Sequence, residues 1–425
     1  MVFDTVISGR VWRNGKFEDN DIGILDGKIK EIKPSISALS KIDYGGCIIV
    51  PAGIDMHVHF RDPGYREKET IYTGSMSAVY GGIGTYFDMP NTRPATSSAD
   101  ACIEKLATMK KNSFSNYGIY GYTDNINNIK NLINHVIGFK IFMAHTTGGL
   151  VLDDSIDLPD LIRNLDLTGK ITVFHAEEPK YFLKEQADNL VKYSKIRNCK
   201  SEAEAIKRVI NVNAKNIHIA HLSCPDNLQY VYGKSFEVTP HHILLNNELP
   251  LNTYGKVNPP IRSEKDRLNL FNAFKEGIVP IMASDHAPHL ENEKIVSFEN
   301  APAGIPGVET MYPLMLYLSK KGLLNISNVI RSLSENPAKL FNLQKGVIAS
   351  NMDADLAIFD MDKVTNIKGN RLHSKAGWTP YEGFSAIFPK DVYIGGIRVI
   401  KEYELNSDPA GRSVVETKKH SNFIN

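Results

Sequence analysis

Two histidines, His57 and His59, stand two residues apart at the end of the apolar run CIIVPAGIDMHVH. Alternate side chains of a β-strand point to one face, so both imidazoles can face one metal ion. Alone, this pair is a weak signal. Two further histidines, His175 and His221, end other apolar runs, and Asp285 ends another. Together they form a donor set that can hold two divalent ions such as zinc.

Lys140 lies inside the apolar run IGFKIFM. A buried ammonium group is unfavourable unless it is paired, so one interpretation is a lysine that reaches solvent or a carboxylate. The other starts from desolvation, which strongly lowers the pKa of a buried lysine. The neutral amine can then add carbon dioxide, and the resulting carbamate has two oxygens that can bridge two metal ions.

Asp285, in ASDHAPH, has a second role open to it. A carboxylate beside an activated water can take its proton and return it to a leaving nitrogen, so we expect Asp285 to be the catalytic acid and base. His241 and His242, in TPHH, are ambiguous and are assigned to the rim of the site or to the residues around the ligands.

Eight apolar runs between Cys47 and His286 carry these residues, separated by helical stretches. They are CIIVPAGIDMHVH, IGTYFDMPN, YGIYGYTD, IGFKIFM, ITVFHAEE, NIHIAHLS, FEVTPHH and IVPIMASDH. Continuous apolar strands alternating with helices are typical of a parallel sheet that is covered on both faces. Eight such units predict an α/β fold of the (β/α)8 TIM type, whose active site lies at the C-terminal ends of the strands.

Both chain ends are rich in strand-like sequence, such as DTVISGRVWRNGKF before the barrel and DVYIGGIRVIKEYEL after it. We expect them to form one small β-sandwich domain. The predicted organisation is a first sandwich part over residues 1–50, a metal-dependent hydrolase barrel over 51–345, and the second sandwich part with the tail over 346–425.

Composition excludes several classes of protein. The 425 residues carry a net charge of +1, so no electrostatic attraction to nucleic acid or an anionic membrane is expected. No apolar run approaches the roughly 20 residues of a membrane span, and no signal peptide is evident. The four cysteines, Cys47, Cys102, Cys199 and Cys224, are scattered, so we expect neither a disulfide framework nor a cysteine zinc site. A cytoplasmic enzyme with a small-molecule substrate is the expectation.

These motifs resemble those of the class I dihydroorotases of the amidohydrolase superfamily, over nearly the whole chain. The matching stretches include DMHVHFRDPG, DMPNTRPAT, GFKIFM, FHAEE, HLS, VTPHH, VNPPIR, ASDHAPH, PAGIPGVET and NPAKLFNL. HVHFRDPG together with DMPNTRPAT is the specific combination, since most other amidohydrolases keep His-x-His without the arginine and the asparagine.

The resemblance implies two zinc ions per subunit and the reversible interconversion of (S)-dihydroorotate and N-carbamoyl-L-aspartate in pyrimidine biosynthesis. The metal ligands that it implies are His57, His59, N6-carboxylated Lys140 as the bridge, His175, His221 and Asp285. The substrate-binding residues that it implies are Arg61, Asn91, Asn258, His289 and the backbone of Ala303 and Gly304. Thr146 and Thr147, in HTTGGL, are expected to form a lid over the substrate.

Several alternatives stay open at this stage. Some class I members bridge the metals with an aspartate, and Asp153 and Asp154 lie a little downstream of Lys140. Ala303 stands where many members carry a bulkier residue. The competing activities are those of allantoinase and of hydantoinase or dihydropyrimidinase, and the competing class is a non-catalytic scaffold with the same fold. Homo-oligomerisation and association with other pyrimidine-pathway enzymes are also left open.

Overall fold

The computed structural model describes residues 2–38, 40–146 and 149–415. Eight strands form a parallel sheet whose spatial order follows the sequence. They are β5 (Gly53–Val58), β6 (Ile83–Asp88), β7 (Asn116–Gly121), β8 (Gly138–Phe142), β9 (Ile171–His175), β10 (Ile217–Ile219), β11 (Ser235–Val238) and β12 (Ile281–Met282). Val58 also bridges in parallel to His286, just beyond β12, which closes the sheet into a barrel. The predicted TIM-type barrel is confirmed, and each of the eight apolar runs overlaps one of these strands.

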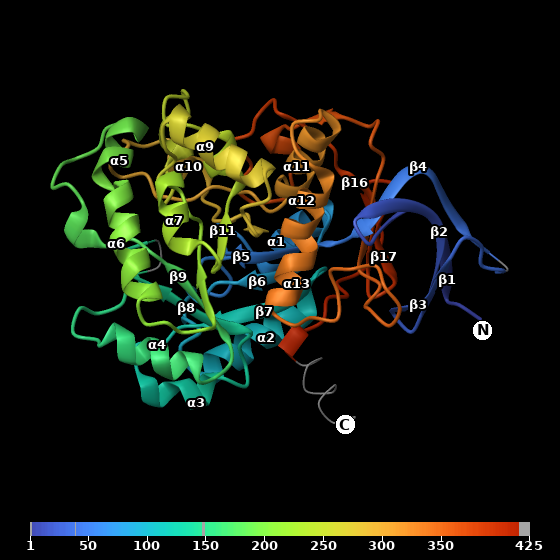
Figure 1. The fold of residues 1–425 in the computed structure, drawn as a ribbon, viewed down its shortest axis with the longest axis horizontal. Coiled ribbons are helices and arrows are strands. Elements are labelled where there is room, and N and C mark those ends of the chain that lie inside the picture. The colour runs from blue at the N-terminus through green and yellow to red at the C-terminus, as the bar shows by residue number, and fades with distance from the viewer. Residues whose placement is uncertain (1, 39, 147–148, 416–425) are drawn as a thin grey trace.

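Helices surround this barrel (Figure 1). Those of the first half are α1 (Ile71–Tyr80), α2 (Ala99–Asn112), α3 (Ile129–Leu132), α4 (Leu158–Asp166), α5 (Leu190–Ile196), α6 (Cys199–Ile210) and α7 (Leu228–Val231). Those of the second half are α8 (Pro240–Leu244), α9 (Glu264–Lys275), α10 (Glu291–Lys294), α11 (Met311–Lys320), α12 (Ile326–Ile330) and α13 (Asn336–Leu340). Polar caps begin several of them: the side chains of Ser98, Asp157 and Asn198 accept backbone N–H groups of α2, α4 and α6. Helix α6 then buries Ala205, Ile206 and Val209.

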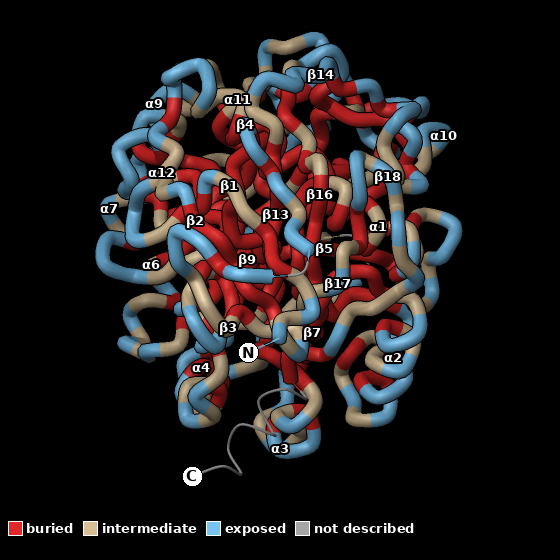
Figure 2. The backbone as a smooth tube through the Cα atoms, turned by 90° about the vertical axis from the view of Figure 1, so that its right-hand side faces the viewer, coloured by how far each residue is buried: buried red, intermediate tan, exposed pale blue. Residues whose placement is uncertain are grey.

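The two chain ends build a second eight-stranded sheet, as predicted from their β-rich sequence. Its strands are β1 (Thr5–Arg13), β2 (Lys16–Leu25), β3 (Lys28–Lys33), β4 (Ile42–Pro51), β13 (Leu356–Phe359), β16 (Pro389–Ile394), β17 (Ile397–Lys401) and β18 (Glu404–Leu405). Strand β4 joins the two ends, because it pairs in parallel with β1 and antiparallel with β13. Figure 2 views the molecule from this side and shows buried segments continuing beneath the sheet. The residue boundaries of the two domains stay predictions.

The first apolar run differs from the expectation of one strand. It contains the end of β4, which lies in the terminal sheet, and β5, which opens the barrel. Both parts are apolar and buried, so hydrophobicity alone does not mark the point at which the chain changes sheet.

Part of the C-terminal region leaves the terminal sheet and contacts the barrel loops. Within it, β14 (Thr365–Asn366) pairs with β15 (Ser385–Ala386). The side chain of Ser374 donates to Glu69, and Nε1 of Trp378 donates to the carbonyl of His289 at 2.8 Å. Among the described residues, no helix is both long and apolar enough to cross a membrane.

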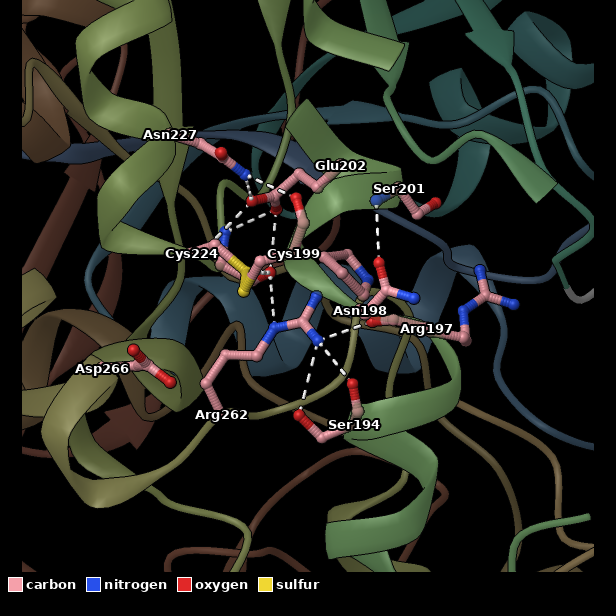
Figure 3. Close-up of a disulfide and its surroundings, with 12 residues drawn as sticks. Ser194, Arg197, Asn198, Cys199, Ser201, Glu202, Cys224, Asn227, Arg262 and Asp266 are labelled. Atoms are coloured by element: carbon pink, nitrogen blue, oxygen red, sulfur yellow. Dashed lines mark hydrogen bonds between the residues drawn. A yellow bond between two sulfur atoms is a disulfide. The ribbon is translucent and has the colours of Figure 1, made fainter. Parts of the chain in front are cut away.

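Cys199 and Cys224 form a disulfide, which the expectation of no disulfide framework did not foresee (Figure 3). The two are 25 residues apart in sequence, but the barrel brings the start of α6 beside the loop after β10. Glu202 of α6 also joins this helix to the loop after β10. Its carboxylate accepts hydrogen bonds from the backbone N–H groups of Ser223 and Cys224 at 2.8 and 3.0 Å. The other two cysteines are buried and free.

Candidate active site

One cavity lies at the C-terminal ends of the barrel strands. Its lining residues are His57, His59, Arg61, Asn91, Lys140, Phe142, Thr146, His175, His221, Asn258, Asp285, Ala287, Ala303 and Gly304. Every site residue expected from the sequence is among them except His289 and Thr147, and Thr147 lies outside the described residues. The barrel therefore brings together residues that are spread over most of the chain.

His57 and His59 turn the same ring atom towards Asp285. Their Nε2 atoms lie 3.3 and 3.2 Å from Oδ1 of Asp285. On the other side of each ring, Nδ1 of His57 contacts the carboxylate of Glu237, and Nδ1 of His59 lies 2.7 Å from Oδ1 of Asn91. A ring that donates through Nδ1 keeps the lone pair on Nε2, which is the form that binds a metal ion.

His175 and His221 form the second half of the cluster. Nε2 of His175 lies 2.8 Å from Glu177, and its Nδ1 faces Nε2 of His221 at 3.0 Å. Arg197 in turn holds Glu177 through an Nε contact of 3.1 Å. Burial lowers the pKa of both histidines, which favours the neutral form needed in a ligand. Ligand atoms of His57, His221 and Asp285 all lie within 4.8 Å of one another.

Lys140 is fully buried on β8, and its Nζ has no hydrogen-bond partner among the described residues. Burial lowers its pKa to about 8, although the charges of Glu237 and Asp285 oppose this. This amine has no hydrogen-bond partner in the described structure, and it lines the same cavity as the four imidazoles. It is therefore suited to contact or react with a molecule or ion bound in that cavity. Asp153, the alternative bridge, is exposed and accepts the N–H of Ser155, and it does not line the cavity.

Arg61 places a cation beside this cluster. It is only 2% exposed, and its contacts are the carbonyl of Pro288 at 3.3 Å and Nε2 of His289 at 3.4 Å. It forms no ion pair with a carboxylate in the part of the chain that the structure describes. Burial lowers its pKa to about 10, so the group is still a cation at neutral pH. A buried guanidinium of this kind is suited to an anion in the cavity.

The far wall of the cavity is built from backbone and amide groups. Asn258 accepts a hydrogen bond from the hydroxyl of Tyr193. Nε2 of His289 lies 3.1 Å from the carbonyl of Ala303, so this histidine links Arg61 to that wall. Gly304 has φ +139°, and a Cβ there would lie 2.4 Å from the carbonyl oxygen of Ala287, which requires glycine.

Three functional side chains sit on unusual backbone. The φ angles of Arg61, His221 and Asp285 are +62°, +37° and +46°, in the left-handed region that residues with a Cβ seldom adopt. Each directs its side chain into the cavity from a turn directly after a strand.

Sequence reasoning missed the carboxylates that orient the histidines. Glu237 lies inside the apolar strand β11, where it contacts His57 and lies 3.1 Å from Nε2 of His218. A charged residue inside an apolar run is the signal that singled out Lys140, and it would have found Glu237 too. Of the ambiguous pair, His242 is held by Thr239 and by the carbonyl of Pro259, at 2.8 and 3.1 Å. Both ring nitrogens of His241 are buried without a hydrogen-bond partner among the described residues.

Residues 48–396 match the model of the amidohydrolase family, which covers most of the chain and all of the cavity residues. The chain belongs to the amidohydrolase family. Members of this family depend on metal, and the histidine and aspartate cluster is a fitting place for it. An amidohydrolase with this intact donor set is an enzyme, which argues against the scaffold alternative.

Relatives that match nearly the whole chain indicate the branch of the family in which it falls. A dihydroorotase of Thermoplasma acidophilum is 37% identical over 99% of this chain and 100% of its own. A dihydroorotase of Methanosarcina mazei is 36% identical over 96% of each chain. Among solved structures, the L-hydantoinase (dihydropyrimidinase) of Arthrobacter aurescens superposes with a TM-score of 0.90 at 26% identity, covering 97% of this chain and all of its own. This amidohydrolase therefore falls within the dihydroorotase branch, and it hydrolyses cyclic amides.

Proposed function

We propose that this amidohydrolase interconverts (S)-dihydroorotate and N-carbamoyl-L-aspartate in pyrimidine biosynthesis. The observation that carries the substrate assignment is the buried Arg61 guanidinium, which has no ion pair in the described structure and lies on the wall of the metal-ligand cavity. Dihydroorotate has a carboxylate beside its cyclic amide, whereas hydantoin, allantoin and dihydrouracil have none. The dihydroorotase relatives support the same assignment.

We propose that His57, His59, His175, His221 and Asp285 hold two zinc ions, with Lys140 as the bridge. The bridge would form when the neutral Lys140 amine adds to carbon dioxide, making an N–C bond and releasing a proton. The lowered pKa of Lys140 supports this step, because more of the group is neutral near physiological pH. When bound, the metal ions would activate a water molecule and polarise the amide carbonyl.

We propose that Asp285 moves the proton. In hydrolysis, the carboxylate accepts a proton from the attacking water and delivers it to the ring nitrogen as the C–N bond breaks. Burial by itself would raise the pKa of Asp285, but the charges and hydrogen bond of His57 and His59 outweigh it and keep the pKa below its usual value. The group is therefore an anion, ready to accept a proton, at neutral pH. In ring closure the same steps run in reverse.

We propose that Arg61, Asn91, Asn258, His289 and the backbone of Ala303 and Gly304 bind the substrate, and that the Thr146 loop closes over it. Thr146 lines the cavity, and its hydroxyl is buried without a partner among the described residues. A hydroxyl in that position is suited to a hydrogen bond with substrate. A cytoplasmic location, self-association and association with other pyrimidine-pathway enzymes stay predictions.

A comparison of substrates tests this function. Purified, zinc-loaded protein should turn over dihydroorotate with a far higher kcat/KM than hydantoin, allantoin or dihydrouracil, because only dihydroorotate engages the Arg61 cation. Turnover is followed by the loss of absorbance of the cyclic amide, with the ring-closing reaction measured on N-carbamoyl-L-aspartate. A preference for hydantoin or dihydrouracil would refute the assignment and favour the activity named for the structural neighbour.

The substitution Arg61→Lys should lower kcat/KM for dihydroorotate roughly 10- to 100-fold, the loss expected when a charge-assisted contact to a carboxylate is removed. Lysine keeps the charge but not the planar pair of donors that matches a carboxylate. Metal content should be unchanged. Arg66→Lys is the matched control, since Arg66 is exposed and pairs with Asp62. An equal loss of activity on substrates without a carboxylate would show that Arg61 does not bind this group.

A further inference from the structure

The wall that carries Ala303 and Gly304 is held by two buried lysines. Lys256 donates to the carbonyls of Phe298, Glu299 and Ala301 at 2.7, 3.0 and 2.7 Å. Lys294, at the end of α10, donates to the carbonyls of Pro302 and Gly304 at 2.8 and 3.1 Å. Five carbonyls of the segment 298–304 therefore turn inward to two ammonium groups.

Neither lysine forms an ion pair with a carboxylate of the described residues, although both are at least 90% buried. Aromatic rings flank them instead: Phe298 lies 5.1 Å from Lys256 and Trp378 lies 5.5 Å from Lys294. Burial is unfavourable for two neighbouring cations, and it lowers the pKa of both groups. A surface loop can satisfy its carbonyls with water and needs no such arrangement.

The hydrogen bonds of the two lysines extend to the backbone of Gly304, which lines the cavity together with Ala303. Lys294 contacts the carbonyl of Gly304 directly, and the N–H of Gly304 donates to the backbone carbonyl of Lys256 at 2.9 Å. His289 contacts the carbonyl of the preceding residue, Ala303. The backbone at 303–304 is thus fixed on both sides of one peptide unit.

We infer that Lys256 and Lys294 are positioning residues, whose ammonium groups fix the segment 298–304 so that Ala303 and Gly304 present a set surface to the substrate. This inference rests on the proposed function, in which that backbone lies beside dihydroorotate. The lysines do not touch the reacting atoms, so they act on substrate binding rather than on the chemical step.

Lys294→Met tests this role, because methionine fills similar space and donates no hydrogen bond. KM for dihydroorotate should rise on the order of tenfold, with kcat changed less than about threefold, as expected when binding is weakened equally in ground and transition states. Metal content should equal that of the wild type. Lys294→Gln, which keeps a donor for one carbonyl, should recover part of the lost affinity.

Lys345→Met is the control for general destabilisation. Lys345 is also buried, but it pairs with Asp355 and does not line the cavity. Amide hydrogen exchange gives a second readout that is independent of turnover. Exchange in a peptide spanning 298–304 should rise in Lys294→Met and stay at the wild-type level in Lys345→Met.

The outcomes separate the two proposals. Inactivity of the wild type on dihydroorotate would overturn the proposed function, while faster exchange in Lys294→Met would still support the positioning of the segment. Unchanged KM and unchanged exchange in folded Lys294→Met would overturn the inference. If Lys294→Met does not fold, Lys294→Gln decides in the same way: raised KM and faster exchange support the inference, and wild-type values overturn it.

Discussion

Replacing Lys140 by alanine is expected to reduce turnover by well over ~100-fold, since loss of even a residue that orients a metal ligand costs about 10- to 100-fold. The variant should also lose at least one metal ion. The reason is that the Nζ of Lys140 is buried without a hydrogen-bond partner in the described structure, in the cavity that the four histidines line. No other nitrogen or carboxylate of β8 can replace a bridging carbamate there.

Metal content by mass spectrometry and turnover should be measured together. Short carboxylic acids such as acetate should restore part of the activity of Lys140→Ala by supplying two oxygens in place of the carbamate. Asp153→Ala is the matched control and should keep both metals and full activity, because Asp153 is exposed. Loss of metal in Asp153→Ala, with a fully active Lys140→Ala, would assign the bridge to the aspartate.

Asp285→Asn is expected to bind substrate and metal but to lose turnover by at least the ~100-fold typical of general acid–base catalysis. Asparagine has the shape of aspartate and tolerates the left-handed backbone at this position, so the substitution adds no strain. It lacks the negative charge of the carboxylate and cannot accept and return a proton. Single-turnover kinetics with metal analysis on the same sample separate this loss from a loss of metal.

The pH dependence of the rates of hydrolysis and ring closure tests whether Asp285 transfers the proton. Because His57 and His59 keep the pKa of Asp285 low, the carboxylate is already ionised at neutral pH, so hydrolysis should gain from rising pH only on the acid side and level off above it. Ring closure needs the proton on Asp285 and should gain from falling pH. On the acid side, the rate profiles of the two directions should therefore have opposite slopes, and both should flatten in Asp285→Asn. Near-normal rates in a fully metallated Asp285→Asn would assign proton transfer to another residue.

The sequence predicts the barrel and the convergence of the candidate metal ligands on one cavity, because both depend on short-range patterns. Each ligand follows an apolar run, and a parallel barrel places all such positions at one end. The supporting network depends on contacts between distant segments. Nothing in the spacing of Cys199 and Cys224 indicates that α6 begins beside the loop after β10. The same holds for Glu177, whose partner Arg197 lies 20 residues further on.

The substrate pocket could be proposed from the sequence only through family resemblance. A surface arginine and a buried one look alike in sequence, and it is the fold that buries Arg61 without an acidic partner in the described structure. Lys256 and Lys294 likewise read as ordinary surface lysines, since their five carbonyl partners belong to a segment with no regular structure.

The left-handed backbone at Arg61, His221 and Asp285 lowers the stability of the fold, whereas the side chains of these residues serve the proposed activity. Each residue with a Cβ in this region costs roughly 1–2 kcal/mol relative to an ordinary conformation, and glycine relieves that cost. The metal-free fold should therefore become more stable when these three residues are replaced by glycine, while the enzyme is lost. A directed-evolution library scored only by unfolding temperature would enrich such inactive variants, whereas saturating metal and substrate in the screen would counter-select them.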